Sequence, residues 1–119
     1  MLIFVFKGLC PKFGNPIGRT NFGKKTFTRL NFWTMHGVYI LRSRKDGELY
    51  TGYSHDVVQR IEEHQNGKVP ATADRRPLEF LYCELYKNRI DAMRREKFFK
   101  SGWGRAYVRK ILYNTLHNS

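Results

Sequence analysis

Two tyrosines on neighbouring expected strands could form one side of a reaction site. Asp46-Gly47, a strong hairpin signal, separates a β-branched and aromatic run at 37–43 from a second run at 49–53. Because side chains alternate along a strand, Tyr39 and Tyr50 are expected on one face. Gly52 would leave a concave spot between them. Aromatic residues are common in strands and glycine can mark a bulge, so a purely structural interpretation stays open.

A cation and an imidazole lie four residues apart on the next expected element, a helix over residues 56–66. The apolar side of this helix comprises Val57, Val58 and Ile61. Arg60 and His64 lie along one border of that side. Such a pair could grip and orient a phosphate. An arginine whose aliphatic stem covers the core, beside a hydrogen-bonded histidine, explains the pattern equally well.

One carboxylate interrupts the apolar side of a later helix, expected over residues 89–101. The apolar side of that helix comprises Ala92, Met93, Phe99 and Trp103. Glu96 falls in the middle of this group, where an ionised carboxylate is costly unless something pairs with it. The partner could be an arginine or a divalent cation. A hard ion such as Mg²⁺ is often held by one or two carboxylates, with water and substrate phosphate completing its shell.

Together these side chains suit the hydrolysis of a phosphodiester bond. The candidate catalytic residues are Tyr39, Tyr50, Arg60, His64 and Glu96. A metal ion held by Glu96 would neutralise charge and stabilise the leaving oxygen. Arg60 would stabilise the pentacovalent phosphorus, and a tyrosine or His64 would orient the attacking water or take its proton.

The elements that must position these residues follow in the order ββαβαα. A two-residue turn at Asp46-Gly47 would pair Leu41 with Gly52, and Ser54 is expected to cap the first helix. We predict in addition a basic loop over 68–77, a third strand over 78–86, a helix capped by Asn88, a break at 102–104 and a last helix over 106–116. The fold class is therefore α+β, with a small three-stranded antiparallel sheet flanked by helices.

Composition and charge narrow the class of protein. The 119 residues suffice for one domain with a single core. Lys and Arg number 22 against 10 Asp and Glu, and a net charge of +12 favours a polyanionic partner, because a phosphate backbone then releases its counterions. No apolar run approaches the ~20 residues of a membrane span. Cys10 and Cys83 show no metal-ligand spacing, so a reduced cytoplasm is the simplest setting.

Residues 1–34 differ from the rest of the chain. Glycines and two prolines interrupt this stretch, which has no helical or alternating periodicity and no acidic residue. It is expected to be a basic, disordered extension, and we favour upstream sequence translated in error, with the natural start at Met35. A basic arm that tracks DNA is the third alternative. The ordered domain is expected over residues 35–119 and to act as a monomer.

The motifs carry a family resemblance. Gly37-Val38-Tyr39 followed by Tyr50-Thr51-Gly52 resembles the signature of the GIY-YIG nuclease superfamily, with Val and Thr each in place of Ile. Arg60, His64 and Glu96 fall where the family's pattern expects them. The resemblance covers residues 36 to about 115. Similarity to the small single-domain bacterial branch, which resembles the endonuclease domain of the excinuclease, also rests on residues 46–47, 63–68, 75–77, 94–97 and 100–103.

The resemblance implies a three-stranded antiparallel sheet with helices and one divalent ion, Mg²⁺ or Mn²⁺, held by Glu96. Tyr39 would be the general base or the group that positions water, assisted by His64. Tyr50 would position the phosphate or the nucleophile, and Arg60 would stabilise the transition state.

These residues predict a metal-dependent DNA endonuclease acting in repair or recombination. A domain this small has little surface for reading base sequence in a groove, so branched, damaged or single-stranded DNA is the expected substrate. Basic residues expected to contact the DNA backbone, unless they are simply a solvated surface, are Lys68, Arg75, Arg76, Lys100 and Arg105.

Two other functions stay open. A non-catalytic nucleic-acid-binding module of the same fold would bind with strong salt dependence and leave its substrates intact. Many family members also use an Asn after the metal-binding Glu, and this sequence has no equivalent, because Asn114 lies in the last expected helix. An adaptor to protein partners could use Tyr107 and Tyr113, although helix packing explains these two aromatic residues as well.

Overall fold

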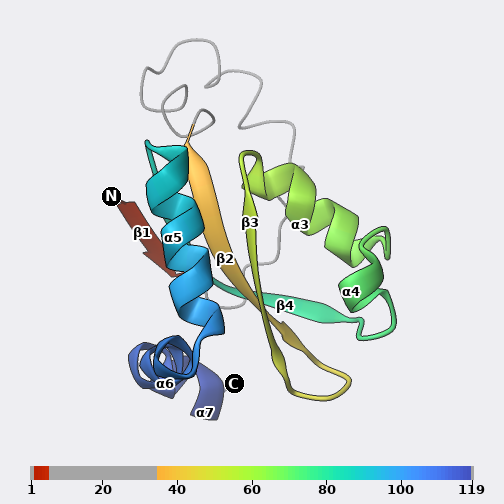
Figure 1. Cartoon of the computed structure of the whole chain (residues 1–119). Coiled ribbons are helices and arrows are strands. Elements are labelled where there is room, and N and C mark those ends of the chain that lie inside the picture. Colours follow the sequence, from red (N-terminus) through yellow and green to blue (C-terminus); the bar gives the residue numbers. More distant parts are fainter. Residues whose placement is uncertain (1, 6–34, 119) are drawn as a thin grey trace, which may run out of the picture.

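The computed structural model describes residues 2–5 and 35–118, which form one antiparallel sheet with helices on both faces (Figure 1). The strand order is β1-β4-β2-β3. The strands are β1 (Leu2–Val5), β2 (His36–Ser43), β3 (Leu49–Ser54) and β4 (Leu78–Tyr86). The helices are α3 (Val57–Gln65), α4 (Pro70–Ala73), α5 (Arg89–Lys100), α6 (Gly102–Ile111) and α7 (Tyr113–His117).

The predicted α+β fold is confirmed. Strands β2, β3 and β4 form the expected three-stranded antiparallel sheet, and helices flank it. The structure adds β1, which pairs with the outer edge of β4 in the register Leu2 with Leu85 to Val5 with Tyr82. Residues 6–34 lie outside the described residues, so a disordered extension and a start at Met35 remain predictions.

The register of the β2–β3 hairpin differs from the predicted one by two residues. Tyr39 pairs with Gly52 and Leu41 with Tyr50, so the connection is a loop over residues 44–47 rather than a two-residue turn. Side chains alternate with a period of two, and a shift of two residues therefore leaves every side chain on its predicted face. Tyr39 and Tyr50 share a face as expected.

Side-chain hydrogen bonds within the loop explain the longer connection. Ser43 Oγ accepts hydrogen bonds from the backbone N–H groups of Lys45 and Asp46, both at 3.1 Å. The carboxylate of Asp46 accepts from the N–H of Glu48 at 2.8 Å, and Gly47 adopts a φ of +78°. Asp and Ser can stabilise turns of several lengths in this way, which an Asp-Gly pair alone does not reveal.

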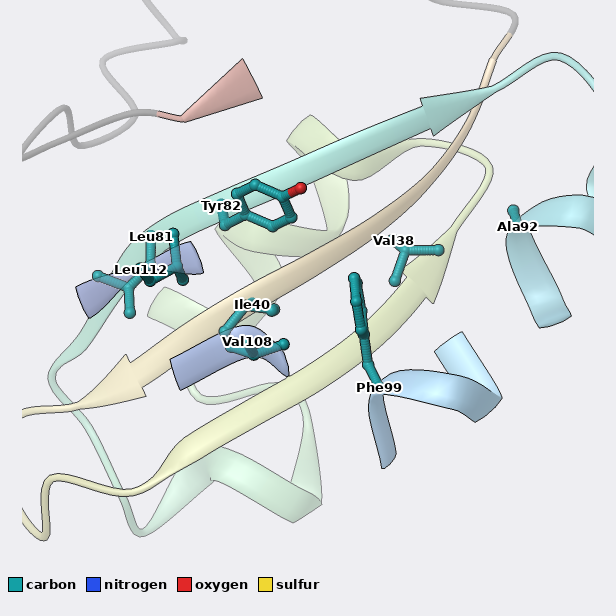
Figure 2. Close-up of a cluster of buried hydrophobic side chains, with 8 residues drawn as sticks. All are labelled: Val38, Ile40, Leu81, Tyr82, Ala92, Phe99, Val108 and Leu112. Carbon is teal, nitrogen blue, oxygen red and sulfur yellow. The ribbon is translucent and has the colours of Figure 1, made fainter. Parts of the chain in front are cut away.

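The two faces of the sheet carry two separate cores. Val38 and Ile40 of β2 face α5 and α6, together with the consecutive residues Leu81 and Tyr82 of β4, where the β2–β4 register is irregular. Figure 2 shows this cluster, with Phe99 of α5 and Val108 of α6 reaching toward the strands. Its buried members are Val38, Ile40, Leu81, Tyr82, Ala92, Phe99, Val108 and Leu112. The opposite cluster packs under α3 and comprises Tyr39, Leu41, Val57, Ile61, Leu78, Phe80, Cys83 and Leu85.

The beginning of α3 lies unusually close to the sheet. A Cβ atom on Gly37 of β2 would overlap the side chain of Val57, so a glycine is needed where the helix passes over the strand. Asp56 caps α3 by accepting a hydrogen bond from the N–H of Gln59, in place of the predicted Ser54. Ser54 is engaged instead with the backbone of Asp56, which holds the cap residue in position.

The remaining boundaries combine confirmed and corrected predictions. The third strand occupies residues 78–86 and Asn88 caps α5, both as predicted. The predicted loop at 68–77 contains the short helix α4, and the single last helix predicted over 106–116 is instead two helices, α6 from Gly102 and α7 from Tyr113. Ser101 Oγ accepts a hydrogen bond from the N–H of Gly104 and so caps α6. Gly102 therefore belongs to the first turn of α6 and not to a linker. No helix in the described ranges is long and apolar enough to cross a membrane.

Candidate active site

A chain of three buried side chains joins the sheet to α3 and α4. The hydroxyl of Tyr39 on β2 lies 2.8 Å from Nε2 of His64 on α3. The other ring nitrogen of His64 lies 2.7 Å from Oγ1 of Thr72 on α4. All three residues are almost completely shielded from solvent. A neutral imidazole has one donor and one acceptor nitrogen, so His64 donates to one of these two hydroxyls and accepts from the other.

Burial sets the protonation states in this chain. Burial first, and the positive charge of Arg60 second, lower the pKa of His64 from 6.5 to about 4, while Glu63 opposes the shift. Burial also raises the pKa of Tyr39 well above 10, and Tyr50 adds to this effect while Arg60 reduces it. At neutral pH the imidazole is therefore uncharged and the phenol is protonated.

Arg60 lies where this chain approaches the surface. Its guanidinium donates to the carboxylate of Glu63 at 2.8 Å, and 42% of the Arg60 side chain is exposed. The hydrogen bond to Glu63 raises the pKa of Arg60 most, and burial opposes it. An interaction with the Tyr39 hydroxyl raises this pKa further. Since a guanidinium has five N–H donors, Arg60 can still offer several of them to a phosphate.

Tyr50 and Gly52 on β3 complete this side of the site. The ring of Tyr50 lies 5.0 Å from that of His64 and 6.5 Å from that of Tyr39, measured between centroids. Gly52 stands opposite Tyr39, and a Cβ at this position would overlap the Tyr39 phenol. The concave spot predicted at Gly52 therefore exists, and the phenol of Tyr39 occupies it.

The predicted environment of Glu96 is wrong. Glu96 is 22% exposed and forms an ion pair with Lys100 at 2.9 Å, one turn along α5. Of the predicted apolar side only Ala92 and Phe99 are buried. Met93 is exposed, and Trp103 belongs to the next helix because α5 ends at Lys100, so that Trp103 is 85% exposed. The negative charge of Glu96 nevertheless contributes to the raised pKa of Tyr39, so the carboxylate lies within electrostatic range of the phenol.

A carboxylate that is fully buried lies elsewhere, at Glu84 on β4. It accepts hydrogen bonds from the hydroxyls of Tyr82 and Tyr86 and two more from the guanidinium of Arg95. Arg95 in turn stacks over the ring of Phe99 at 4.6 Å. The alternation Tyr-x-Glu-x-Tyr in a strand places these three side chains on one face, a signal that was present in the sequence but did not enter the prediction.

The predicted DNA-contacting residues fall into two groups. Lys100 and Arg105 line a pocket of about 310 Å³ beside Tyr50. Lys68, Arg75 and Arg76 lie in the connection between α3 and β4. There Arg75 pairs with Asp46 at 3.1 Å and Arg76 donates to the carbonyl of Ala73. These two arginines thus stabilise loops, while the first group adjoins the candidate site.

The residues around Glu96 fit one kind of metal site. No three His, Cys, Asp or Glu side chains gather within the described part of the chain, so a metal cage built wholly from such side chains is excluded there. A single accessible carboxylate suits Mg²⁺ or Mn²⁺, whose remaining ligands are water and substrate oxygens. The ammonium group of Lys100 shows that the carboxylate can accept a cation on its open side.

Comparisons with known proteins identify the family of this chain. Residues 35–108 match the family model described as the GIY-YIG catalytic domain. Over 67 residues, 56% of this chain and 80% of each relative, the chain is 45% identical to a UPF0213 protein of Staphylococcus epidermidis, 42% to one of Staphylococcus aureus and 40% to one of Staphylococcus saprophyticus. No solved structure matches the chain significantly. The chain therefore belongs to the GIY-YIG nuclease superfamily, within its small single-domain branch.

Proposed function

We propose that this protein is a metal-dependent DNA endonuclease that hydrolyses phosphodiester bonds in branched, damaged or single-stranded DNA, in repair or recombination. The observation that carries the proposal is the buried hydrogen-bond chain Tyr39–His64–Thr72, which ends beside the exposed guanidinium of Arg60. Buried polar groups are retained at a free-energy cost, and this chain leads from the core to a cation that can bind phosphate. The superfamily implies a nucleic-acid substrate, and DNA fits the charge of the protein.

The buried chain provides a path for a proton. When Nδ1–H of His64 donates to Thr72 Oγ1, Nε2 accepts the hydroxyl proton of Tyr39. The Tyr39 oxygen then keeps a lone pair that can accept a proton from the attacking water while its own proton moves to Nε2. Because the pKa of His64 is about 4, the imidazole returns to its neutral form by giving this proton back through the Tyr39 oxygen, from which it passes to the leaving oxygen.

The other side chains act on the phosphate. Arg60 neutralises the charge that develops on the phosphoryl oxygens, since its free N–H donors face solvent at the end of the buried chain. Tyr50 packs against both Tyr39 and His64, so its hydroxyl orients the phosphate or the water relative to them.

Glu96 is the residue that would hold the metal ion. GIY-YIG nucleases generally use divalent metals. When bound, Mg²⁺ or Mn²⁺ would neutralise phosphate charge and stabilise the leaving oxygen. Lys100, the present partner of Glu96, would then be released toward the neighbouring pocket, where its charge favours the DNA backbone.

A second candidate, a nucleic-acid-binding module without catalysis, is favoured by one observation. The Glu96 carboxylate is already paired with Lys100, and no Asn side chain is positioned beside it in any interaction of the described residues. Asn114 is exposed on α7, as its position in the sequence suggested. Such a module would bind DNA and leave it intact.

A cleavage screen distinguishes the two candidates. Flap, fork, junction and abasic DNAs are incubated with wild type, Glu96→Gln and the matched control Glu62→Gln, an exposed carboxylate on α3, with Mg²⁺ or Mn²⁺. We expect wild type and Glu62→Gln to nick at least one substrate, and Glu96→Gln to be slower by about 100-fold or more. Binding without cleavage by wild type, or equal cleavage by Glu96→Gln, would contradict the proposed function.

A further inference from the structure

A pocket next to the candidate active site is defined by β3, α5 and α6. We name it the β3–α6 pocket. It has a volume of about 310 Å³, and Tyr50 forms part of its wall. Its floor consists of Leu49, Phe99 and Val108, and its cationic rim of Lys100, Arg105 and Arg109. The ring of Tyr50 faces His64 on the opposite side of β3 from Leu49, Phe99 and Val108, so the pocket and the candidate active site flank the same edge strand of the sheet.

The rim of the β3–α6 pocket is cationic. Arg105 and Arg109 are four residues apart on α6, so their side chains project on the same side of the helix. Within the described residues, no carboxylate pairs with either guanidinium. Lys100 forms an ion pair with Glu96. Among the described lining residues, the acidic one is Glu48. Two unpaired guanidinium groups side by side suit a phosphate.

The floor of the pocket has the opposite chemistry. Phe99 and Val108 are buried core residues, and Leu49 packs against the same cluster. A ligand that fills the pocket therefore needs an anionic group at the rim and an apolar or aromatic part at the floor. A nucleotide has both, in its phosphate and in its sugar and base. In a continuous duplex the bases are stacked and paired, so an unpaired nucleotide reaches such a floor without the cost of unpairing.

We propose that the β3–α6 pocket binds one unpaired nucleotide of a DNA strand that crosses edge strand β3 to the candidate active site, with its phosphate on Arg105 and Arg109. Its sugar and base lie against Leu49 and Val108. The inference rests on the proposed function, because it takes DNA as the substrate, and it makes the substrate class narrower. The pocket gives the protein a preference for strands with unpaired nucleotides over continuous duplex DNA.

The test measures binding apart from cleavage. A fluorescent single-stranded oligonucleotide and the duplex of the same sequence are titrated by fluorescence anisotropy in EDTA, where neither is cut. The double variant Arg105→Gln/Arg109→Gln is compared with Arg94→Gln/Lys110→Gln, which removes two exposed charges of α5 and α6 outside the pocket. We expect the pocket variant to bind the single strand about tenfold or more weakly, with duplex binding reduced no more than in the control.

A second variant tests the floor without changing the charge. Thr51→Phe places a ring in the pocket and should weaken single-strand binding about tenfold while leaving duplex binding near the wild-type value. Equal losses on both DNAs, losses equal to those of the control, or unchanged single-strand binding by Thr51→Phe would overturn the proposal. Circular dichroism melting curves show that each variant is folded. A protein that passes this test but cuts nothing would refute the endonuclease and retain the nucleotide pocket.

Discussion

Two clusters of buried polar residues lie on opposite faces of the sheet, and they differ in how they end. Under α5, Glu84 receives four hydrogen bonds from Tyr82, Tyr86 and Arg95, and these contacts close the cluster on itself. Under α3, the chain from Thr72 through His64 to Tyr39 leads to the rim, where Arg60 meets solvent. We name them the Glu84 cluster and the His64 chain.

The difference teaches how to separate a scaffold from a reaction site. Both regions contain tyrosines with strongly raised pKa values, in both cases mainly because of burial, so this property does not distinguish them. The Glu84 carboxylate has all its lone-pair directions engaged by protein donors, which leaves little for a ligand. The Tyr39 hydroxyl donates to or accepts from His64 and also interacts with Arg60, whose guanidinium reaches solvent. A buried polar chain that ends at an exposed cation marks the candidate site.

The largest expected effect breaks the closed cluster. Glu84→Ala removes the partner of a partly buried guanidinium and of two tyrosine hydroxyls, so it should lower the free energy of unfolding by about 3–5 kcal/mol. Glu96→Ala removes a partly exposed pair and should change it by less than about 1 kcal/mol. Urea denaturation measures both. Equal losses would mean that the Glu84 cluster does not hold α5 to the sheet.

The next effect separates catalysis from stability. Tyr39→Phe and Tyr82→Phe each delete one hydroxyl that contacts a buried polar group, and each should lower the free energy of unfolding by about 1–2 kcal/mol. Only Tyr39→Phe should slow DNA cleavage, by about 100-fold or more, because the proton path begins at its oxygen. Initial rates under single-turnover conditions provide the measurement. If Tyr82→Phe were slowed as much, the assignment of roles to the two faces would be wrong.

Acidification should lower the free energy of unfolding, because His64 is buried in its neutral form. The pKa of His64 is about 4 in the folded protein against an ordinary 6.5, so between these values the unfolded chain binds more protons than the folded one. Stability is therefore retained above about pH 6.5 and lost as the pH falls toward 4, by about 2–3 kcal/mol in total. His64→Gln should lack this part of the loss. Denaturation curves recorded at several pH values give the free energy of unfolding of both proteins. If it fell equally steeply with decreasing pH in wild type and in His64→Gln, the prediction would be contradicted.

The smallest effect concerns the residue that selects the tautomer. Thr72→Val keeps the shape of the side chain but removes the partner of His64 Nδ1, and should lower the free energy of unfolding by about 1–2 kcal/mol. Cleavage should slow by about tenfold, and Thr72→Ser should restore most of it. Nitrogen NMR shifts of the imidazole report the tautomer directly. An unchanged tautomer in Thr72→Val would show that Thr72 only fills space.

Local patterns were sufficient for much of this molecule. The alternation along β2 and β3 placed Tyr39 and Tyr50 on one face, and the spacing of four residues placed Arg60 and His64 on one side of α3. The third strand and the cap of α5 follow from β-branched and aromatic content and from Asn88. These features depend on neighbours in the chain, and so the amino-acid sequence determined them by itself.

Only the tertiary structure decided which partner each polar side chain has. The hairpin register depended on hydrogen bonds of Ser43 and Asp46, and the surroundings of Glu96 on where Ser101 ended α5. Thr72 joined His64 because α4 folds back against α3, and Arg109 joined the pocket because α6 turns toward β3. Hydrogen bonds and ion pairs act over a few ångströms in space, whereas periodicity records only separation along the chain. The candidate tyrosines were therefore visible in the sequence, and the hydrogen-bond chain that begins at one of them was not.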